Sequence, residues 1–295
     1  MTTDAETVEN GVLAQVACVW EATARKVGNV HPGIDFADTS YTDFLVSAAA
    51  VGDVFGRPAA DRVGRRVWEA THATRRLIGK NTNLGIVLLL APLSLIGRGR
   101  LAREQLADVL AALTVEDTER VYAAIRLAKP GGLGDAPEQD VRDDPTVALL
   151  EAMRLAADRD LVARQYASSF ADVLDFGVPA FLAAFARYGC VEAAVIDSQL
   201  RWLASYPDSL IARKNGPDVA ADVRERAAEV LRRGGLDTPE GRRAGVEFDR
   251  HLRSDGNRLN PGTTADLITA CLFVALRERK VTPAAPFRWH VPDWL

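Results

Sequence analysis

The chain has 295 residues, 48% of them hydrophobic and 26% charged, with a formal net charge of −4 at pH 7. This composition is typical of a globular protein with a sizeable core, and the acidic balance argues against a nucleic-acid-binding surface. The cysteines, Cys18, Cys190 and Cys271, lie far apart without a CxxC motif. We therefore expect reduced, buried thiols in the cytoplasm, and neither a disulfide framework nor a zinc site.

Acidic residues near the start of the chain do not fit a secretory signal. The most apolar stretch, residues 86–96, is too short to cross a bilayer, so we expect no contact with a membrane. Apolar residues recur at helical spacing, and strict alternation typical of strands is missing. This pattern predicts helices up to about residue 55 and over 59–78, 84–96, 102–113, 115–129, 144–157, 160–187, 190–205, 219–233, 239–254 and 263–279.

The predicted fold is all-α, a compact single-domain bundle of about a dozen helices. The predicted domain covers residues 1–282. The segment 283–295 contains Pro, Phe and Trp residues and is expected to pack back on the domain, since exposed tryptophans are unfavourable.

The first break between helices, residues 26–38, carries more chemistry than a turn requires. Lys26, Asn29 and His31 offer donors for phosphate, while Asp35 and Asp38 offer carboxylates for a hard metal ion or for proton transfer. The simpler interpretation of Asp38 is a cap on the helix that begins near residue 40.

The second break is residues 79–85. Lys80, Asn81 and Asn83 precede an apolar helix starting at Leu84, whose free N–H groups favour a bound phosphate. One of the polar residues is also expected to cap this helix. The two breaks are predicted to form two walls of one phosphate-handling pocket.

Two later segments add candidates. Asp208 begins a short helix that ends with Arg213 and Lys214 before an Asn-Gly turn, a set that suits a triphosphate–metal site or simply complements the helix ends. Asp266 lies three residues after Thr263, which predicts a pair resembling a capping box at the final helix.

Six segments in the same order make the chain resemble the triphosphoribosyl-dephospho-CoA synthase family. They are residues 26–48, 79–85, 132–134, 158–166, 208–216 and 260–267. The resemblance implies an all-α cytoplasmic enzyme that transfers the 5-triphosphoribosyl group of ATP to the 2′-hydroxyl of 3′-dephospho-CoA and releases adenine. Its product is a prosthetic-group precursor of citrate lyase or malonate decarboxylase. Asn83-Leu84 stands where the citrate-lyase branch has His-Lys, as in divergent copies linked to methanopterin-type cofactor biosynthesis.

For such a reaction, one carboxylate would stabilise the oxocarbenium-like transition state and another would take the proton of the acceptor hydroxyl. The predicted catalytic residues are Asp35, Asp38 and Asp208, with Mg²⁺ on Asp38 and Asp208. The predicted nucleotide-binding residues are Lys26, Asn29, His31, Lys80, Asn81, Asn83, Arg213, Lys214 and Asp266.

The expected partners are ATP as substrate and a small-molecule acceptor, and a homodimer is the common state of such enzymes. Two other functions remain open from the residues alone. One is a magnesium-dependent ribosyl or nucleotide hydrolase, which shares the chemistry at ribose C1′. The other is a non-catalytic nucleotide-binding protein of a one-carbon cofactor pathway. A prenyl-diphosphate synthase is disfavoured, because the sequence contains no DDxxD motif.

Overall fold

The computed structural model describes residues 4–57, 62–96 and 103–287, and within them it contains helices and no strand beyond one isolated bridge, His31 with Ile34. The helices of the first half are α1 (Asp4–Thr23), α2 (Tyr41–Phe55), α3 (Val63–Ile78), α4 (Leu84–Ser94), α5 (Arg103–Ala111), α6 (Val115–Ala128) and α7 (Leu149–Ala156). Those of the second half are α8 (Leu161–Ala167), the π-helical turn Asp172–Gly177, α9 (Val178–Tyr188), α10 (Val191–Ser205), α11 (Ser209–Asn215), α12 (Pro217–Arg232), α13 (Pro239–Arg253) and α14 (Gly262–Arg277). The predicted all-α class is confirmed.

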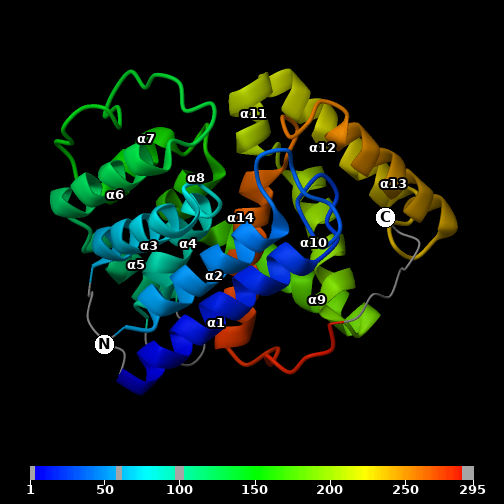
Figure 1. The fold of residues 1–295 in the computed structure, drawn as a ribbon, viewed down its shortest axis with the longest axis horizontal. Coiled ribbons are helices and arrows are strands. Elements are labelled where there is room, and N and C mark those ends of the chain that lie inside the picture. The colour runs from blue at the N-terminus through cyan, green and yellow to red at the C-terminus, as the bar shows by residue number, and fades with distance from the viewer. Residues whose placement is uncertain (1–3, 58–61, 97–102, 288–295) are drawn as a thin grey trace.

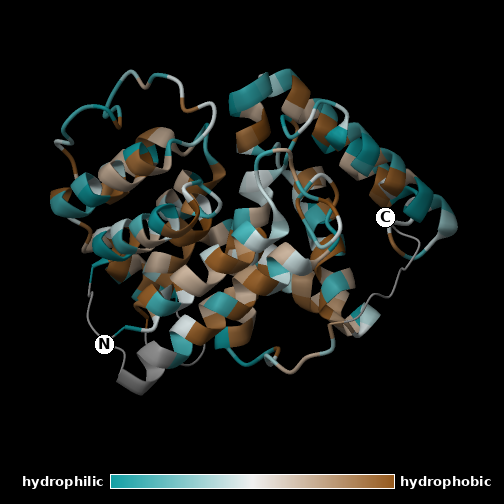
Figure 2. Cartoon of the chain, viewed as in Figure 1, coloured by the Kyte–Doolittle hydropathy of each residue, from teal (hydrophilic) through white to brown (hydrophobic). Residues whose placement is uncertain are grey.

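Helices α1 and α14 pack against each other at the centre of the molecule, with α2–α8 mainly on one side and α9–α13 on the other (Figure 1). The apolar helix α4 is buried along nearly its whole length, as is α14 from Leu267 to Arg277. In the hydropathy view, brown gathers toward the centre of the molecule, whereas much of the outer surface of α12 and α13 is teal (Figure 2). A second cluster of buried apolar side chains joins α10, α12 and α13. The two central helices therefore give the site a rigid base.

One predicted helix, residues 160–187, is broken in the structure. Helix α8 ends at Ala167, and Ser169 and Phe170 adopt positive φ angles of 51° and 60°. Phe170 is fully buried by this turn, and the side chain of Gln165 accepts a hydrogen bond from the N–H of Val173 at 3.2 Å. Helical periodicity continues across the break, which is why the sequence pattern did not reveal it.

The start of α2 rules out the simpler interpretation of the first break, because neither Asp38 nor Thr39 is the N-cap of this helix. Ser40 is the N-cap and forms a capping box with Asp43. Capping boxes with a Glu or Gln three residues after the Ser are the usual signature, and here the shorter Asp43 takes that place.

Near the C-terminus, Ala285 and Phe287 pack against the core, and the N–H of Val191 donates to the carbonyl of Pro286 at 2.9 Å. The predicted packing of Trp289 and Trp294 lies outside the described residues. Cys18, Cys190 and Cys271 are buried free thiols, as expected. Taken one at a time, the described helices lack the length and hydrophobicity of a membrane span, and only the sharply bent pair Leu161–Ala167 and Asp172–Tyr188 meets that test jointly.

Candidate active site

A cleft of about 700 Å³ brings the two breaks of the N-terminal half together with segments from the C-terminal half. Its walls are the α1–α2 connection, the turn before α4, the long loop after α6, helix α11 and the start of α14. The long loop and α11 face each other at the top of Figure 1. Asp38, Asn81 and Lys214, which are remote in sequence, thus line the same cleft.

Side-chain bonds tie the first two walls to each other. The ammonium of Lys80 contacts Oδ2 of Asp43 at 2.8 Å, and the hydroxyls of Ser47 and Thr82 are hydrogen-bonded. The Lys80 ammonium and the adjacent backbone hold the pKa of Asp43 below its usual range. Lys80 lines the cleft and keeps 42% of its side chain exposed, so its charge faces incoming anions.

Asn81 and Asn83 line the cleft while also holding the turn before α4. Oδ1 of Asn81 accepts a hydrogen bond from the N–H of Leu84 at 3.2 Å. The amide of Asn83 donates to the hydroxyl of Thr74 at 3.0 Å. Asn81 therefore supplies the cap expected from this cluster, which leaves the Asn83 amide oxygen directed away from capping.

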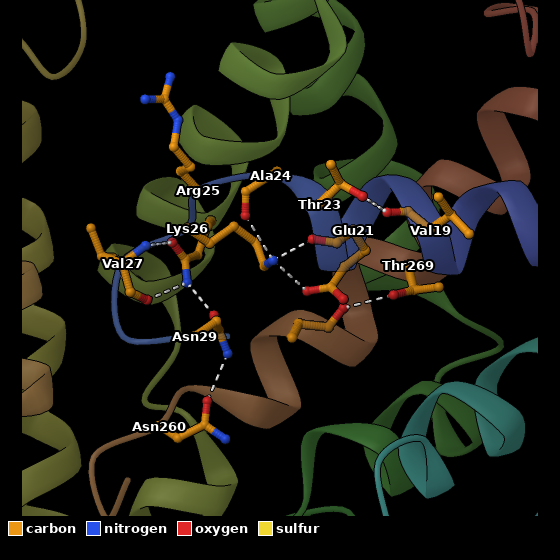
Figure 3. A network of polar contacts seen from close by, with 12 residues as sticks. Val19, Glu21, Thr23, Ala24, Arg25, Lys26, Val27, Asn29, Asn260 and Thr269 are labelled. Carbon is orange, nitrogen blue, oxygen red and sulfur yellow. Dashed lines mark hydrogen bonds and ion pairs between the residues drawn. The ribbon is translucent and has the colours of Figure 1, made fainter. Parts of the chain in front are cut away.

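Gln199 of α10 fixes the first break from behind. Its side chain accepts from the N–H of Val27 at 2.9 Å and donates to the carbonyl of Val27 at 2.8 Å and to Oδ1 of Asn29 at 2.7 Å. Asn29 in turn donates to Oδ1 of Asn260 at 2.7 Å (Figure 3). This chain of amides aligns Asn29 and Asn260 on the cleft surface. Nothing in the sequence around Gln199 indicated this role.

Lys26 does not reach the cleft. Its side chain is fully buried, and its ammonium bonds to the Glu21 carboxylate at 3.0 Å, the Glu21 carbonyl, and the Ala24 carbonyl at 3.3 Å (Figure 3). An ammonium has three donors, and all of them are used. The predicted phosphate contact of Lys26 is thus replaced by an internal ion pair that places Glu21 on the cleft floor.

His31 and Asp35 also lie outside the cleft lining. Burial lowers the pKa of His31 to about 4, so its imidazole is neutral at pH 7 and offers no charge to a phosphate. Asp35 is exposed, and its Oδ1 accepts a hydrogen bond from the N–H of Tyr41 at 2.7 Å. The first break contributes Asn29 and Asp38 to the cleft instead.

Asp208, predicted to be catalytic and metal-binding, does not line the cleft, and its carboxylate makes hydrogen bonds within the protein. Its Oδ1 caps α11 by accepting from the N–H groups of Leu210 and Ile211, at 2.9 and 3.1 Å. Its Oδ2 accepts from both the N–H and the hydroxyl of Thr264, at 2.7 and 2.8 Å. The side chain is fully buried behind the cleft wall, so both oxygens serve to join α11 to α14.

Two cations at the end of α11 line the cleft. Arg213 forms an ion pair with Asp160, and its Nε is buried without a hydrogen-bond partner in the described part of the chain. Burial lowers the pKa of Lys214, while the negative charge of Asp38 partly offsets that effect. With Lys80 on another wall, these groups make the cleft suitable for a polyanion.

The described residues contain no group of three or more His, Cys, Asp or Glu side chains placed to hold a metal ion. Asp38 is an exposed carboxylate on the cleft whose Oδ1 accepts from Thr39 and Asn257. One or two carboxylates suffice for Mg²⁺ when substrate phosphates complete its coordination. Of the two predicted Mg²⁺ ligands, Asp38 lines the cleft and would be available to an ion that arrives with a nucleotide, whereas Asp208 does not line it.

The predicted Thr263–Asp266 pair does not form, because the hydroxyl of Thr263 accepts from Ser209 and Asp208 serves the N–H of Thr264. Asp266 is instead turned toward Gly85 at the start of α4, where a Cβ would lie 2.0 Å from its Oδ2. It shares the cleft lining with Glu21. Both carboxylates are largely withdrawn from solvent, and Glu21 was absent from the predicted set.

Beneath the long loop, the cleft is mainly apolar. Its surface there is formed by Val121, Ile125, Leu133, Leu149 and Met153 together with alanines of α6 and α7. The hydroxyl of Tyr122 donates to the carbonyl of Gln139 at 2.6 Å and so holds the loop over this half. The cleft thus combines this apolar surface with charged groups, among them Asp135, Glu138 and Asp140 of the loop itself, and such a combination is usual in small-molecule sites.

Comparison with known proteins identifies relatives of this chain. Residues 9–283 match the family model described as "CitG: ATP:dephospho-CoA triphosphoribosyl transferase". A Pseudomonas syringae protein named "probable 2-(5''-triphosphoribosyl)-3'-dephosphocoenzyme-A synthase" is 26% identical over 82% of this chain and 76% of its own length. A Pseudomonas putida protein of the same name is 34% identical, over 37% of this chain and 39% of its own length.

A crystal structure from Archaeoglobus fulgidus, named as a triphosphoribosyl-dephospho-CoA synthase, superposes with a TM-score of 0.63 at 27% identity, over 79% of this chain and 98% of that one. The family model spans most of the chain, and the resemblance seen in the sequence is confirmed. The chain belongs to the ATP:dephospho-CoA triphosphoribosyl transferase family.

Proposed function

We propose that the protein transfers the 5-triphosphoribosyl group of ATP to a hydroxyl of a dephospho-CoA-type acceptor and releases adenine. The observation that carries this proposal is that one cleft is lined both by the cations of Lys80, Arg213 and Lys214 and by the carboxylates of Glu21 and Asp266. The reaction leaves the triphosphate intact and breaks the bond from C1′ to adenine. It therefore needs cations along the triphosphate and carboxylates at the ribose, which is the division that the cleft provides.

In this proposal the triphosphate lies between the α11 cations and Lys80. Mg²⁺ held by Asp38 would neutralise part of the phosphate charge. Asn29, Asn81 and Asn83 lie along the same surface and can bind ribose hydroxyls or phosphate oxygens. The apolar half under the long loop suits the flat adenine ring or the uncharged arm of the acceptor.

The test is incubation of the purified protein with ATP and Mg²⁺, with dephospho-CoA, with a methanopterin-type precursor, or without an acceptor. Free adenine and the adduct mass are measured by liquid chromatography and mass spectrometry. Adenine that appears together with the acceptor adduct supports the proposal and names the acceptor. Adenine without any acceptor indicates a hydrolase, and bound but intact ATP indicates a non-catalytic nucleotide-binding protein.

A further inference from the structure

Asp266 differs from two other carboxylates that line the cleft, because its side chain has no partner. Glu21 is paired with Lys26, and Asp160 is paired with Arg213 and caps α8. Within the described ranges, Asp266 has neither a hydrogen-bond nor an ion-pair partner, although it is mostly buried and lines the cleft. A carboxylate removed from water without a partner is unfavourable, so its retention in this position requires another explanation.

The packing around Asp266 holds it in place without neutralising it. It lies one turn into the rigid helix α14 and abuts the first turn of α4 at Gly85. Glu21 and the thiol of Cys18, both on α1, lie close enough to interact with it electrostatically, as do the charged groups of Asp160, Asp208 and Arg213. The carboxylates of Glu21, Asp160 and Asp208 outnumber the cations, which are Arg213 and the Lys26 ammonium paired with Glu21.

These surroundings favour proton uptake by Asp266. Burial raises its pKa well above the ordinary range for an aspartate, and the negative charges of Glu21, Asp208 and Asp160 raise it further, with Arg213 opposing them. A carboxylate accepts a proton from a hydroxyl most effectively when its pKa approaches the working pH. Both the position and the surroundings of Asp266 thus suit a base.

We infer that Asp266 is the general base that takes the proton of the acceptor hydroxyl, and that the Glu21–Lys26 pair positions and supports it. This inference rests on the proposed function. The acceptor oxygen forms its bond to C1′ while the bond from C1′ to N9 of adenine breaks, and the electron pair of that bond leaves with adenine. The hydroxyl proton passes to the Asp266 carboxylate and ends on the departing base, so protons balance over the turnover.

Glu21 acts as a positioning residue in this scheme. The buried Lys26 ammonium fixes the Glu21 carboxylate through the 3.0 Å contact and through the backbone turn that Lys26 also bonds. A fixed negative charge beside Asp266 favours its protonated form, which is the form that follows proton abstraction. Removing this charge should therefore lower the pKa at which activity appears.

The experiment compares wild type, Asp266→Asn and Asp266→Ala in the adenine-release assay with dephospho-CoA, together with ATP binding by calorimetry. We expect the Asn variant to bind ATP with unchanged or higher affinity and to lose about 10²–10⁴-fold in kcat. Formate is expected to restore part of the rate of the Ala variant, because a small carboxylate fits the vacated space. A purely structural role for Asp266 predicts no rescue.

The supporting role of Glu21 is tested with the double variant Glu21→Gln/Lys26→Met, which removes the buried pair without leaving one charge alone. The acidic limb of its kcat/KM profile should move to lower pH, and an unmoved limb would contradict the inference. The inference is also overturned if wild type releases adenine and the Asp266→Asn variant keeps the wild-type kcat. If wild type releases no adenine with any acceptor, the proposed function fails instead, and the two failures are distinguishable.

Discussion

Gly85 and Asp266 approach so closely that a Cβ on residue 85 would lie 2.0 Å from Oδ2 of the carboxylate. The contact joins the first turn of α4, which follows the second polar break, to the central helix α14. It exists because glycine has no side chain and lets the carboxylate rest against the helix start. The geometry of the proposed base thus depends on a residue from the other end of the chain.

Gly85→Ala is expected to displace the Asp266 carboxylate and to lower kcat about 10²-fold, since a displacement near 1 Å at a reacting group has effects of this order. In an Asp266→Ala background the added methyl group should change neither kcat nor thermal stability, because the clash is gone. Steady-state kinetics of the four proteins complete the cycle. If the Gly85→Ala enzyme keeps the wild-type kcat, the contact between Gly85 and Asp266 does not contribute to catalysis and the prediction is wrong.

Asp266→Asn is expected to stabilise the fold near neutral pH. The folded-state pKa of Asp266 is raised, so the folded protein binds the proton more tightly than the unfolded chain does. Stability from this group is then greatest below the unfolded pKa of about 4 and falls as pH rises toward the folded pKa. Thermal unfolding should give the Asn variant a higher Tm at pH 7.5 and nearly the wild-type Tm below pH 4. A lower Tm at pH 7.5 would show that the charge contributes to folding.

His31 gives the opposite pH dependence. Its pKa of about 4 in the fold lies below its usual 6.5 because of burial, so the unfolded chain binds the proton more tightly. The contribution of neutral His31 is fully present above about pH 6.5 and is lost as pH falls through 4. At about 1.4 kcal/mol per pH unit, wild type should lose about 3 kcal/mol more than His31→Asn between pH 7 and pH 4. Denaturant unfolding at both pH values measures the difference, and parallel losses would refute it.

Asp208→Asn is expected to weaken folding while leaving the chemistry nearly intact. An amide has one acceptor oxygen in place of two, so either the N–H groups that donate to Oδ1 or the N–H and hydroxyl of Thr264 that donate to Oδ2 lose their acceptor. Loss of such buried bonds costs about 1–3 kcal/mol. We expect a lower Tm and a kcat within about threefold of wild type below the transition. A folded variant whose kcat is reduced about 10²-fold would show that Asp208 takes part in catalysis.

Lys214→Ala is expected to raise KM for ATP by about 10–100-fold, since hydrogen bonds to charged groups contribute about 1.5–3 kcal/mol. The matched control is Lys280→Ala, whose ammonium pairs with Glu278 after α14 and does not line the cleft. The control should keep the wild-type KM and its salt dependence. Equal effects of the two substitutions would indicate general electrostatics and no phosphate contact at Lys214.

Helical periodicity was sufficient for the fold class and for most helix bounds. The short helix predicted between Asp208 and Gly216 is observed as Ser209–Asn215 with Asp208 as its cap. The break at Ser169–Phe170 was missed because its positive φ angles are imposed by burial of Phe170, which local propensity does not report.

The polar breaks predicted a shared cleft, and Asn29, Asp38, Lys80, Asn81, Asn83, Arg213, Lys214 and Asp266 do line one. The roles inside that cleft were harder to predict, because they depend on long-range partners. Lys26 pairs with Glu21, and Asp208 accepts hydrogen bonds from Thr264. Neither the Lys26 nor the Asp208 side chain therefore lines the cleft. Glu21 was detectable only as a lone acid in an apolar helix followed by Lys26 five residues later.

The most direct test of this account is a crystal structure of Asp266→Asn with ATP, Mg²⁺ and dephospho-CoA. Density for the triphosphate between Lys80 and Lys214, with ribose C1′ and the acceptor hydroxyl beside residue 266, is the result we expect. A nucleotide bound elsewhere, or one whose ribose points away from residue 266 within the cleft, would contradict it.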